Sequence, residues 1–271
     1  MAEVVVVTGI GGMGVVAARR LGNGRQLVIA DFDGKKLAAE AEALRGDGFA
    51  VTPVEVDVSD RASVADLAAT AGSLGSLRAL VHTAGLSPTM ASGERVLQVD
   101  LLGTEYVLEA FTPLVIDGTV AVCIASMAGY MSSLTSEQCA TLITADADDL
   151  LDLVGPVDGL NFGDTYGIAK RVNHLRVERY AGIWGPKGGR VVSISPGIIS
   201  TPMGQQEITQ GAGEQMQGML DMSPVPRIGT AEDIGAAVQW LCGPEASFVT
   251  GCDLRVDGGV TGAIHSMGFG L

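Results

Sequence analysis

Three side chains in the middle of the chain could together move a proton to or from an alcohol: Ser126, Tyr166 and Lys170. Tyr166 and Lys170 stand four positions apart, and a helix brings residues at this spacing onto one face. A free phenol has a pKa near ~10 and is a poor base at neutral pH, but a neighbouring cation favours the phenolate. The pattern is therefore typical of a tyrosine tuned for acid–base catalysis. By itself it is more often a surface pair, so the rest of the chain must decide.

The elements that would position these residues alternate between strands and helices. Continuous apolar runs, typical of buried parallel strands, occur at residues 4–8, 26–31, 50–56, 77–82, 119–124, 190–194 and 254–256. Amphipathic stretches predict helices at 13–21, 35–45, 61–71, 94–111, 166–184 and 232–241. Thr230 and Asp233 predict a capping box at the start of the last helix. This alternation predicts one α/β domain over 1–271, a Rossmann-type doubly wound parallel sheet with helices on both faces.

Length and composition agree with one large domain. The chain has 271 residues, of which 47% are hydrophobic and 18% charged, so a large core is expected and disorder is not. No apolar run approaches the roughly 20 residues that span a bilayer, and the N-terminus leads directly into a strand, so we expect no membrane segment and no signal segment. The cysteines include no C-x-x-C pair. We therefore expect reduced thiols, a cytoplasmic protein and no metal site.

The net charge of −14 limits the possible partners. It argues against binding to nucleic acids and to anionic membranes, because both are negatively charged. It argues more weakly against polyanionic protein partners such as acyl carrier protein. The alternative is that the acidic residues only solvate the surface.

A glycine-rich turn from Thr8 to Gly14 follows the first predicted strand and opens a helix. Glycines at this point allow a tight turn and let backbone N–H groups approach a pyrophosphate. The helix N-terminus adds unpaired donors and a partial positive charge. Glycine turns also occur without ligands, but this strand–turn–helix context predicts nucleotide binding.

Asp31, at the end of the second strand, predicts which nucleotide is bound. A carboxylate at this point accepts hydrogen bonds from the adenosine ribose and repels a 2′-phosphate. The glycine turn has no Arg or Lys, and Phe32 and Asp33 add no positive charge. We therefore expect NAD, with NADP less favoured. The alternative is an ordinary turn residue, since Asp33 and Gly34 are a turn signal.

Taken together, these motifs resemble the short-chain dehydrogenase/reductase family from Val4 to about Val260. The family's glycine motif, TGxxxGxG, is one residue longer than the matching turn formed by Thr8, Gly9, Gly12 and Gly14. The resemblance implies a Rossmann-type fold, a nicotinamide cofactor and chemistry on CH–OH groups.

The resemblance also implies the residues that touch the cofactor. Asp57 and Val58 match the pair that flanks the adenine ring. His82 replaces an asparagine thought to hold strands together, so we expect it to be structural. Cofactor contacts are implied for Gly9, Gly12, Met13, Gly14, Asp31, Asp57, Val58, Thr83, Ala84, Gly85, Tyr166, Lys170, Pro196, Gly197, Ile199 and Thr201.

In the family, residues matching Ser126, Tyr166 and Lys170 are catalytic; the alternative for Ser126 is a strand-end turn serine. The family's fourth catalytic residue, an asparagine, corresponds to Asp100. Two roles are open for Asp100. Either its backbone carbonyl helps hold a water that leads from Lys170 to solvent, as in the family, or its carboxylate strengthens the ammonium form of Lys170.

Two segments are expected to give the protein its individual properties. An acidic stretch at about 132–164 separates Ser126 from Tyr166 more widely than is usual in the family, and it predicts an insertion of two short helices or a surface elaboration without a chemical role. In this insertion the chain resembles the 3α-hydroxysteroid dehydrogenase/carbonyl reductase group of the family. A stretch at about 203–226 predicts a lid over the substrate. Its methionines form either a packed face or an apolar pocket: Met216, Met219 and Met222.

The expected function is NAD-dependent hydride transfer between a secondary alcohol and a ketone, on a steroid-like or other apolar substrate, in a homo-oligomer (dimer or tetramer). A 3-oxoacyl-thioester reductase usually prefers NADP and a basic docking patch, which Asp31 and the acidic charge disfavour. A nucleotide-sugar epimerase needs a C-terminal sugar domain, for which 271 residues leave no room. A non-catalytic NAD-sensing protein would not need Ser126, Tyr166 and Lys170 together.

Overall fold

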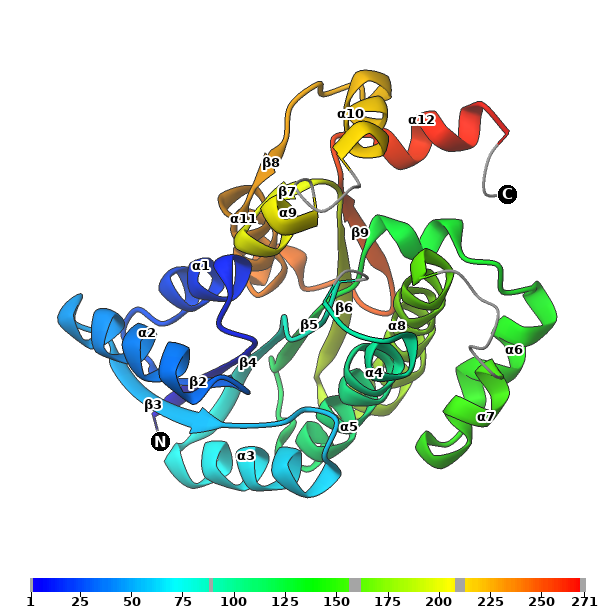
Figure 1. The fold of residues 1–271 in the computed structure, drawn as a ribbon. Coiled ribbons are helices and arrows are strands. Elements are labelled where there is room, and N and C mark those ends of the chain that lie inside the picture. The colour runs from blue at the N-terminus through cyan, green and yellow to red at the C-terminus, as the bar shows by residue number, and fades with distance from the viewer. Residues whose placement is uncertain (1, 88–89, 156–161, 208–212, 269–271) are drawn as a thin grey trace.

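Seven parallel strands form the central sheet of the computed structural model, which describes residues 2–87, 90–155, 162–207 and 213–268 (Figure 1). Their spatial order is β3-β2-β1-β4-β5-β6-β9. Their bounds are β1 Glu3–Thr8, β2 Gln26–Asp31, β3 Ala50–Glu55, β4 Ser76–His82, β5 Val120–Ile124, β6 Arg190–Pro196 and β9 Asp253–Val256. Each predicted strand matches one of these to within a few residues.

Helices cover both faces of this sheet. One face carries α1 (Gly12–Leu21), α2 (Gly34–Gly46) and α11 (Ala231–Leu241). The other carries α3 (Arg61–Leu74), α5 (Gly103–Phe111) and α8 (Phe162–Trp184). Successive strand residues point to opposite faces, so Val5 and Val7 belong to the first core and Val4 and Val6 to the second. The predicted doubly wound α/β fold is confirmed, and so is the capping box at Thr230.

The region predicted as one helix over 94–111 has three parts. A short α4 (Gly93–Val96) leads into a π-helical segment, Leu97–Leu102, before α5 begins. A π turn contains one residue more than an α turn, and such turns are frequent at functional sites. Asp100 lies in this turn and is fully buried. The irregular turn therefore contains Asp100, the residue for which the sequence leaves two roles open.

The stretch predicted as an insertion contains two short helices, α6 (Ser136–Thr144) and α7 (Leu150–Val154), with a 3₁₀ turn (Ala147–Asp149) between them. The stretch predicted as a lid contains α9 (Pro202–Glu207) and α10 (Gly213–Met222). Residues 156–161 of the insertion and 208–212 of the lid lie outside the described residues. A terminal helix, α12 (Val260–Ser266), was not expected and packs near α10 (Figure 1).

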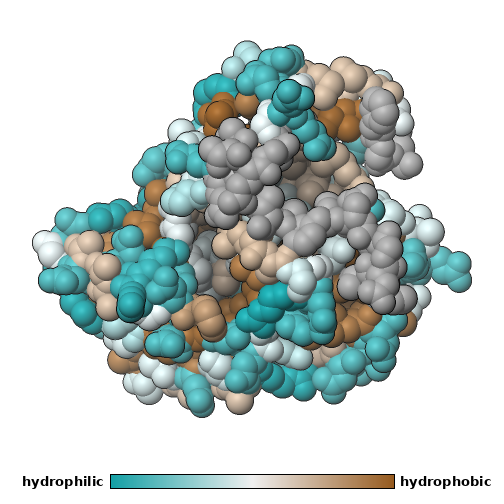
Figure 2. Space-filling model, in the orientation of Figure 1, coloured by the Kyte–Doolittle hydropathy of each residue, from teal (hydrophilic) through white to brown (hydrophobic). Residues whose placement is uncertain are grey.

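The remaining elements are short. Two two-residue strands, β7 (Ile199–Ser200) and β8 (Gly229–Thr230), pair with each other beside the lid. Further 3₁₀ segments are Thr112–Leu114, Met127–Met131, Gly185–Lys187 and Pro244–Ala246. Within the described ranges, no helix combines the length and the apolar character needed to cross a membrane. Figure 2 shows hydrophobic residues reaching the surface around the middle of one face, with hydrophilic residues along much of the rim.

Candidate active site

The predicted site residues gather at the carboxyl ends of the central strands. β1, β4, β5 and β6 are neighbours in the sheet, so the segments that follow them meet at one edge. A cavity of about 620 Å³ opens at this edge. The predicted residues that line it are Met13, Thr83, Gly85, Asp100, Ser126, Tyr166, Lys170, Pro196, Gly197, Ile199 and Thr201. Catalytic and cofactor candidates from distant parts of the chain thus share one cavity.

The turn after β1 requires glycine at two positions. Gly9 has a φ of +79°, and a Cβ on it would lie 2.4 Å from the backbone nitrogen of Ala84. A Cβ on Gly14 would lie 2.0 Å from the Gly9 carbonyl oxygen. Thr83 Oγ1 donates to that same oxygen at 2.5 Å, which fixes the turn to the segment after β4. The result is a narrow turn at the N-terminus of α1, an arrangement that suits a dinucleotide pyrophosphate.

The segment after β6 lies against the same turn. A Cβ on Gly12 would come within 3.3 Å of Thr201 Cγ2, so the two segments assigned to the cofactor are in contact. Gly197 lies still closer to the residue after β9, because a Cβ on it would lie 2.7 Å from Asp257 Cα. Both glycines therefore allow close packing around the cavity.

Asp31 lies at the predicted ribose position, but a lysine accompanies it. Its Oδ2 accepts a hydrogen bond from Ile10 N at 2.7 Å, and its Oδ1 accepts one from Asp33 N at 3.0 Å. Lys36 Nζ, from the first turn of α2, is 3.4 Å from Asp31 Oδ2. The glycine turn itself has no Arg or Lys, but the local charge also includes Lys36. A cation lies within reach of the carboxylate.

Asp57 is held by protein groups at the predicted adenine position. Its Oδ1 accepts from Ser59 N and Oγ at 3.0 and 2.6 Å, and its Oδ2 accepts from Arg95 Nη2 at 2.9 Å. Burial acts to raise the pKa of Asp57, but these hydrogen bonds outweigh it and lower the pKa. Val58 is buried, and a Cβ on Gly103 would lie 2.8 Å from its Cγ2. Ser59 and Arg95 therefore fix the orientation of the Asp57 carboxylate.

Ser126 and the Tyr166 helix are brought together by two glycines. Ser126 caps the 3₁₀ segment after β5, where its Oγ accepts from Ala128 N at 3.1 Å. A Cβ on Gly167 would lie 3.2 Å from the Ala128 carbonyl oxygen. A Cβ on Gly129 would lie 3.0 Å from the backbone of α8 at Lys170. Close packing of this segment against α8 therefore turns both Ser126 and Tyr166 into the cavity lining.

Lys170 is held by a direct ion pair. Its Nζ lies 3.1 Å from Asp100 Oδ2 and donates to the Ile124 carbonyl oxygen at 3.2 Å. Asp100 Oδ1 accepts from Leu86 N at 2.7 Å. The carbonyl oxygen of Asp100 already accepts from Thr104 Oγ1 at 2.8 Å. Of the two roles open for Asp100, the geometry therefore favours the one played by its carboxylate.

The charges around Lys170 favour its ammonium form. Burial acts to lower the pKa of Lys170, but Asp100 and then Tyr166 outweigh it, and the pKa is raised. Burial raises the pKa of Asp100, and the Lys170 ammonium opposes this. Burial, helped by Lys170, lowers the pKa of His82 to about 3. Burial raises the pKa of the Cys123 thiol to about 12. Burial therefore keeps His82 and Cys123 uncharged at physiological pH, and Asp100 supports the Lys170 ammonium.

His82 has the structural position that its replacement of an asparagine suggests. It is 1% exposed, and its Nδ1 is 2.7 Å from Thr8 Oγ1 on the neighbouring strand β1. The side-chain bond joins β1 to β4 directly below the glycine turn.

Sequence reasoning missed Lys36, Arg95 and Thr104, whose roles depend on folded geometry. It also missed a group of methionines from separate segments that line the cavity beside the predicted Met13, Met216 and Met219. These are Met127 and Met131, and Met203 from the start of the predicted lid also lines the cavity. The predicted Met222 is 37% exposed and is not part of the lining.

Two family models match the chain. Residues 3–138 match the model described as short chain dehydrogenase. Residues 151–261 match the model described as Enoyl-(Acyl carrier protein) reductase. The stretch between the two matches, 139–150, lies in the insertion.

Individual relatives match along nearly the whole chain. A short-chain dehydrogenase/reductase of Alternaria brassicicola is 35% identical over 94% of each chain. The 7alpha-hydroxysteroid dehydrogenase of Bacteroides fragilis is 25% identical over 97% of this chain and 95% of its own. A solved short-chain type dehydrogenase/reductase from Mycobacterium ulcerans has a TM-score of 0.76 at 26% identity, over 96% of this chain and 90% of its own. With these matches and the fold, the chain belongs to the short-chain dehydrogenase/reductase family of oxidoreductases.

Proposed function

We propose that this protein is an NAD-dependent oxidoreductase that interconverts an apolar secondary alcohol and its ketone. The observation that carries the proposal is that Ser126, Tyr166 and Lys170 line one cavity directly beside the glycine turn. The turn leaves no room for a Cβ at Gly9 or Gly14, as expected where a backbone must approach a pyrophosphate closely. When bound, NAD would supply the acceptor for the hydride that leaves the alcohol carbon.

In this proposal Tyr166 moves the proton. In the oxidation direction its phenolate takes the proton of the substrate hydroxyl, and in reduction its phenol returns it. Lys170, whose Nζ is 5.5 Å from the Tyr166 ring centroid, stabilises the phenolate by its charge. Ser126 donates a hydrogen bond to the substrate oxygen and orients it. Asp100 keeps Lys170 charged in a buried site, and it acts through Lys170 rather than on the substrate.

The cofactor choice within this proposal rests on opposing charges. Asp31 favours a free ribose over a 2′-phosphate, since two negative groups repel. Lys36 weakens that repulsion, but its side chain is 43% exposed, so solvent screens its charge. We therefore propose NAD as the preferred cofactor, with measurable use of NADP.

Two substitutions test this choice. Asp31→Ser is expected to raise the ratio of kcat/KM with NADP to kcat/KM with NAD by about tenfold or more, because the repulsion is removed. Lys36→Ala is expected to lower the same ratio by roughly twofold to fivefold, because the unscreened part of its charge is small. Both ratios come from initial rates with one alcohol. An unchanged ratio in Asp31→Ser would refute the role of Asp31.

The substrate is proposed to be apolar because methionines from several elements line the cavity. Thioether side chains are flexible and polarisable, so they adapt to hydrophobic ligands of different shapes. Met203, Met216 and Met219 come from the lid region, which we propose covers the substrate. The relative from Bacteroides fragilis, named as a 7alpha-hydroxysteroid dehydrogenase, gives additional support for a steroid-like ligand.

A substrate panel tests the proposed activity. Steroid, aliphatic and aromatic secondary alcohols are assayed with NAD and NADP, and acetoacetyl-CoA is assayed with NADH and NADPH. We expect the highest kcat/KM for apolar alcohols with NAD. Thioester reduction as the fastest reaction would instead support a 3-oxoacyl-thioester reductase. NAD binding with no turnover of any compound would support a non-catalytic NAD-sensing protein.

We also propose a homo-oligomer in the cytoplasm. Phe248 and Trp240 are 102% and 41% exposed, and Phe248 shortly precedes the outermost strand β9. Apolar groups of this kind near a sheet edge favour association. All four cysteines are free thiols, in keeping with a reducing compartment. Light scattering of the purified protein tests the assembly, and a monomeric mass at micromolar concentration would contradict it.

A further inference from the structure

Two buried ion pairs join the same two stretches of helix. The first is Asp100 with Lys170, between the π turn and α8, at 3.1 Å. The second is Glu105 with Arg176, between α5 and α8, at 2.6 Å. Glu105 follows Asp100 by five positions and Arg176 follows Lys170 by six, so the second pair lies further along the same helices. The distance between the two charged groups in each pair therefore depends on the spacing of these helices.

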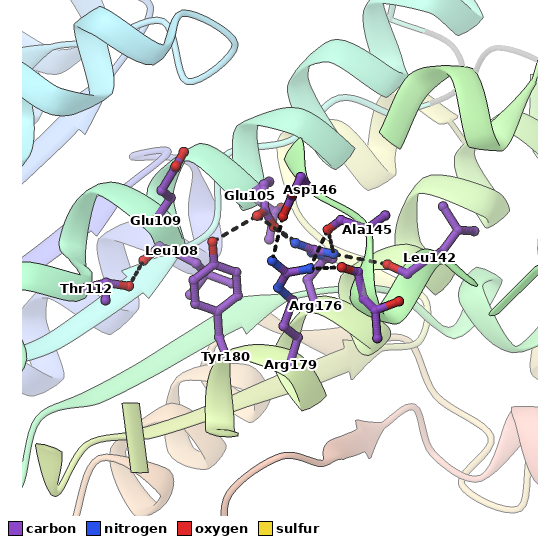
Figure 3. A network of polar contacts seen from close by, with 12 residues as sticks. Glu105, Leu108, Glu109, Thr112, Leu142, Ala145, Asp146, Arg176, Arg179 and Tyr180 are labelled. Atoms are coloured by element: carbon purple, nitrogen blue, oxygen red, sulfur yellow. Dashed lines mark hydrogen bonds and ion pairs between the residues drawn. The ribbon is translucent and has the colours of Figure 1, made fainter. Parts of the chain in front are cut away.

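The Glu105–Arg176 pair is fully formed and shielded from water (Figure 3). Arg176 Nε and Nη2 donate to the two carboxylate oxygens of Glu105 at 2.6 and 2.7 Å. Tyr180 OH donates to Glu105 Oε1 at 2.9 Å. Arg176 is 0% and Glu105 3% exposed. A two-pronged pair of this kind fixes both distance and orientation, which a single contact does not.

The same arginine also holds the insertion. Arg176 Nη1 donates to the carbonyl oxygens of Leu142 and Ala145, at the end of α6, at 3.0 and 2.8 Å. Arg179, one helical turn nearer the surface, donates to the carbonyl oxygens of Thr144 and Ala145 and pairs with Asp146 (Figure 3). The insertion is therefore bonded to two arginines of α8, of which only Arg176 also pairs with Glu105.

Hydrophobic packing joins the insertion to both helices. Leu142 and Leu150 of the insertion belong to one buried cluster with Leu101 beside Asp100 and with Ala169 beside Lys170. The insertion thus packs on the two helical segments that carry the Asp100–Lys170 pair.

We propose that the Glu105–Arg176 pair positions Lys170, by setting the spacing of α5 and α8 on which the Asp100–Lys170 contact depends. The expected effect on kcat rests on the proposed function, whereas the expected effect on the position of Lys170 does not. Breaking a buried pair leaves an uncompensated charge, which the surroundings relieve by moving. A lengthened Asp100–Lys170 contact then leaves the Lys170 ammonium less supported. The other titratable groups facing Lys170 are Tyr166, Cys123 and His82. Burial disfavours the charged forms of Cys123 and His82, because it raises the pKa of the thiol and lowers that of the imidazole.

The test uses lysine NMR, which needs no turnover. The sequence contains four lysines, Lys35, Lys36, Lys170 and Lys187, so ¹⁵Nζ-labelled lysine gives few signals, and Lys170→Arg identifies the one from Lys170. In Glu105→Gln, Arg176 keeps its carbonyl partners but loses the ion pair. We expect the Lys170 signal to lose its ammonium character at a pH lower by about one unit or more than in the wild-type protein.

Arg179→Ala is the matched control, because it weakens the insertion contact and leaves Glu105–Arg176 intact. We expect an unchanged Lys170 titration and a kcat within about twofold of the wild type, while kcat of Glu105→Gln falls about tenfold. Tyr180→Phe removes one hydrogen bond to Glu105 and keeps both charges, and it should shift the titration in the same direction by less.

Two results would overturn the proposal. One is a wild-type Lys170 titration in Glu105→Gln, or in Tyr180→Phe if Glu105→Gln does not fold, whatever the change in Tm. The other is an equal shift in Arg179→Ala, which would make the insertion contact the cause. If no substrate is turned over, the titration still decides the positioning role, and only the proposed function fails.

Discussion

Replacing Tyr166 with phenylalanine is expected to lower kcat by at least about a hundredfold, and up to about ten thousandfold, while NAD binding stays within about twofold of the wild type. The hydroxyl is the group that exchanges a proton with the substrate, and a positioned acid or base contributes this range. The ring remains, so its contact with Lys170 Nζ is kept. Initial rates with the best alcohol of the panel and calorimetric titration with NAD measure the two quantities.

Tyr106→Phe is the control for this experiment. Tyr106 lies on α5, and its ring packs under Arg61, a contact that phenylalanine keeps. Its kcat should equal that of the wild type. Retained turnover in Tyr166→Phe would remove Tyr166 from the mechanism.

Replacing Asp100 with asparagine is expected to affect both stability and pH dependence. The Lys170 ammonium loses its buried partner, and loss of one member of such a pair costs about 3–5 kcal/mol of unfolding free energy. Asp100 raises the pKa of Lys170 against the effect of burial. Without Asp100, burial dominates and the ammonium is lost at a lower pH. The alkaline limb of the kcat/KM profile should therefore move to lower pH.

Denaturant unfolding and a pH series of kcat/KM measure these two effects. Asp66→Asn, the same change at an exposed position of α3, should leave both near wild type. The sign of the pH effect distinguishes the two roles of Asp100. An unchanged alkaline limb in a folded Asp100→Asn protein would favour the backbone carbonyl as the functional group.

The sheet could be predicted because its strands are buried on both faces. Val4–Val7 and Leu27–Ala30 read as continuous apolar runs, and in the structure these residues are 0% exposed. The capping box at Thr230 and the glycine turn were readable for a similar reason, since their chemistry lies within a few neighbouring residues.

Features that depend on distant contacts could not be read in this way. The π turn at Asp100 was not predicted, because apolar residues fill most positions of Leu97–Leu102 and such a segment fits a regular α-helix equally well. Lys36 lies close to Asp31 because of the direction in which α2 starts, and the sequence does not show this direction. Arg176 and Glu105 are 71 positions apart, and no local sequence pattern predicts that they pair.

The candidate site also contains both kinds of feature, those that the sequence predicts and those that depend on distant contacts. Ser126, Tyr166 and Lys170 were identified by motif, and the structure gathers them into one cavity. The motif left open how Lys170 is held, because the family's asparagine is replaced. The 3.1 Å contact with Asp100 supplies an answer that required coordinates.

The most direct test of the central claim is hydride tracing. An active secondary alcohol carrying deuterium on its carbinol carbon is incubated with NAD and either the wild-type protein or Tyr166→Phe, and the nicotinamide product is analysed by mass spectrometry. We predict one deuterium in the reduced nicotinamide with the wild type and no detectable transfer with the variant. Reduced cofactor without the label, or equal transfer by both proteins, would contradict alcohol oxidation at Tyr166.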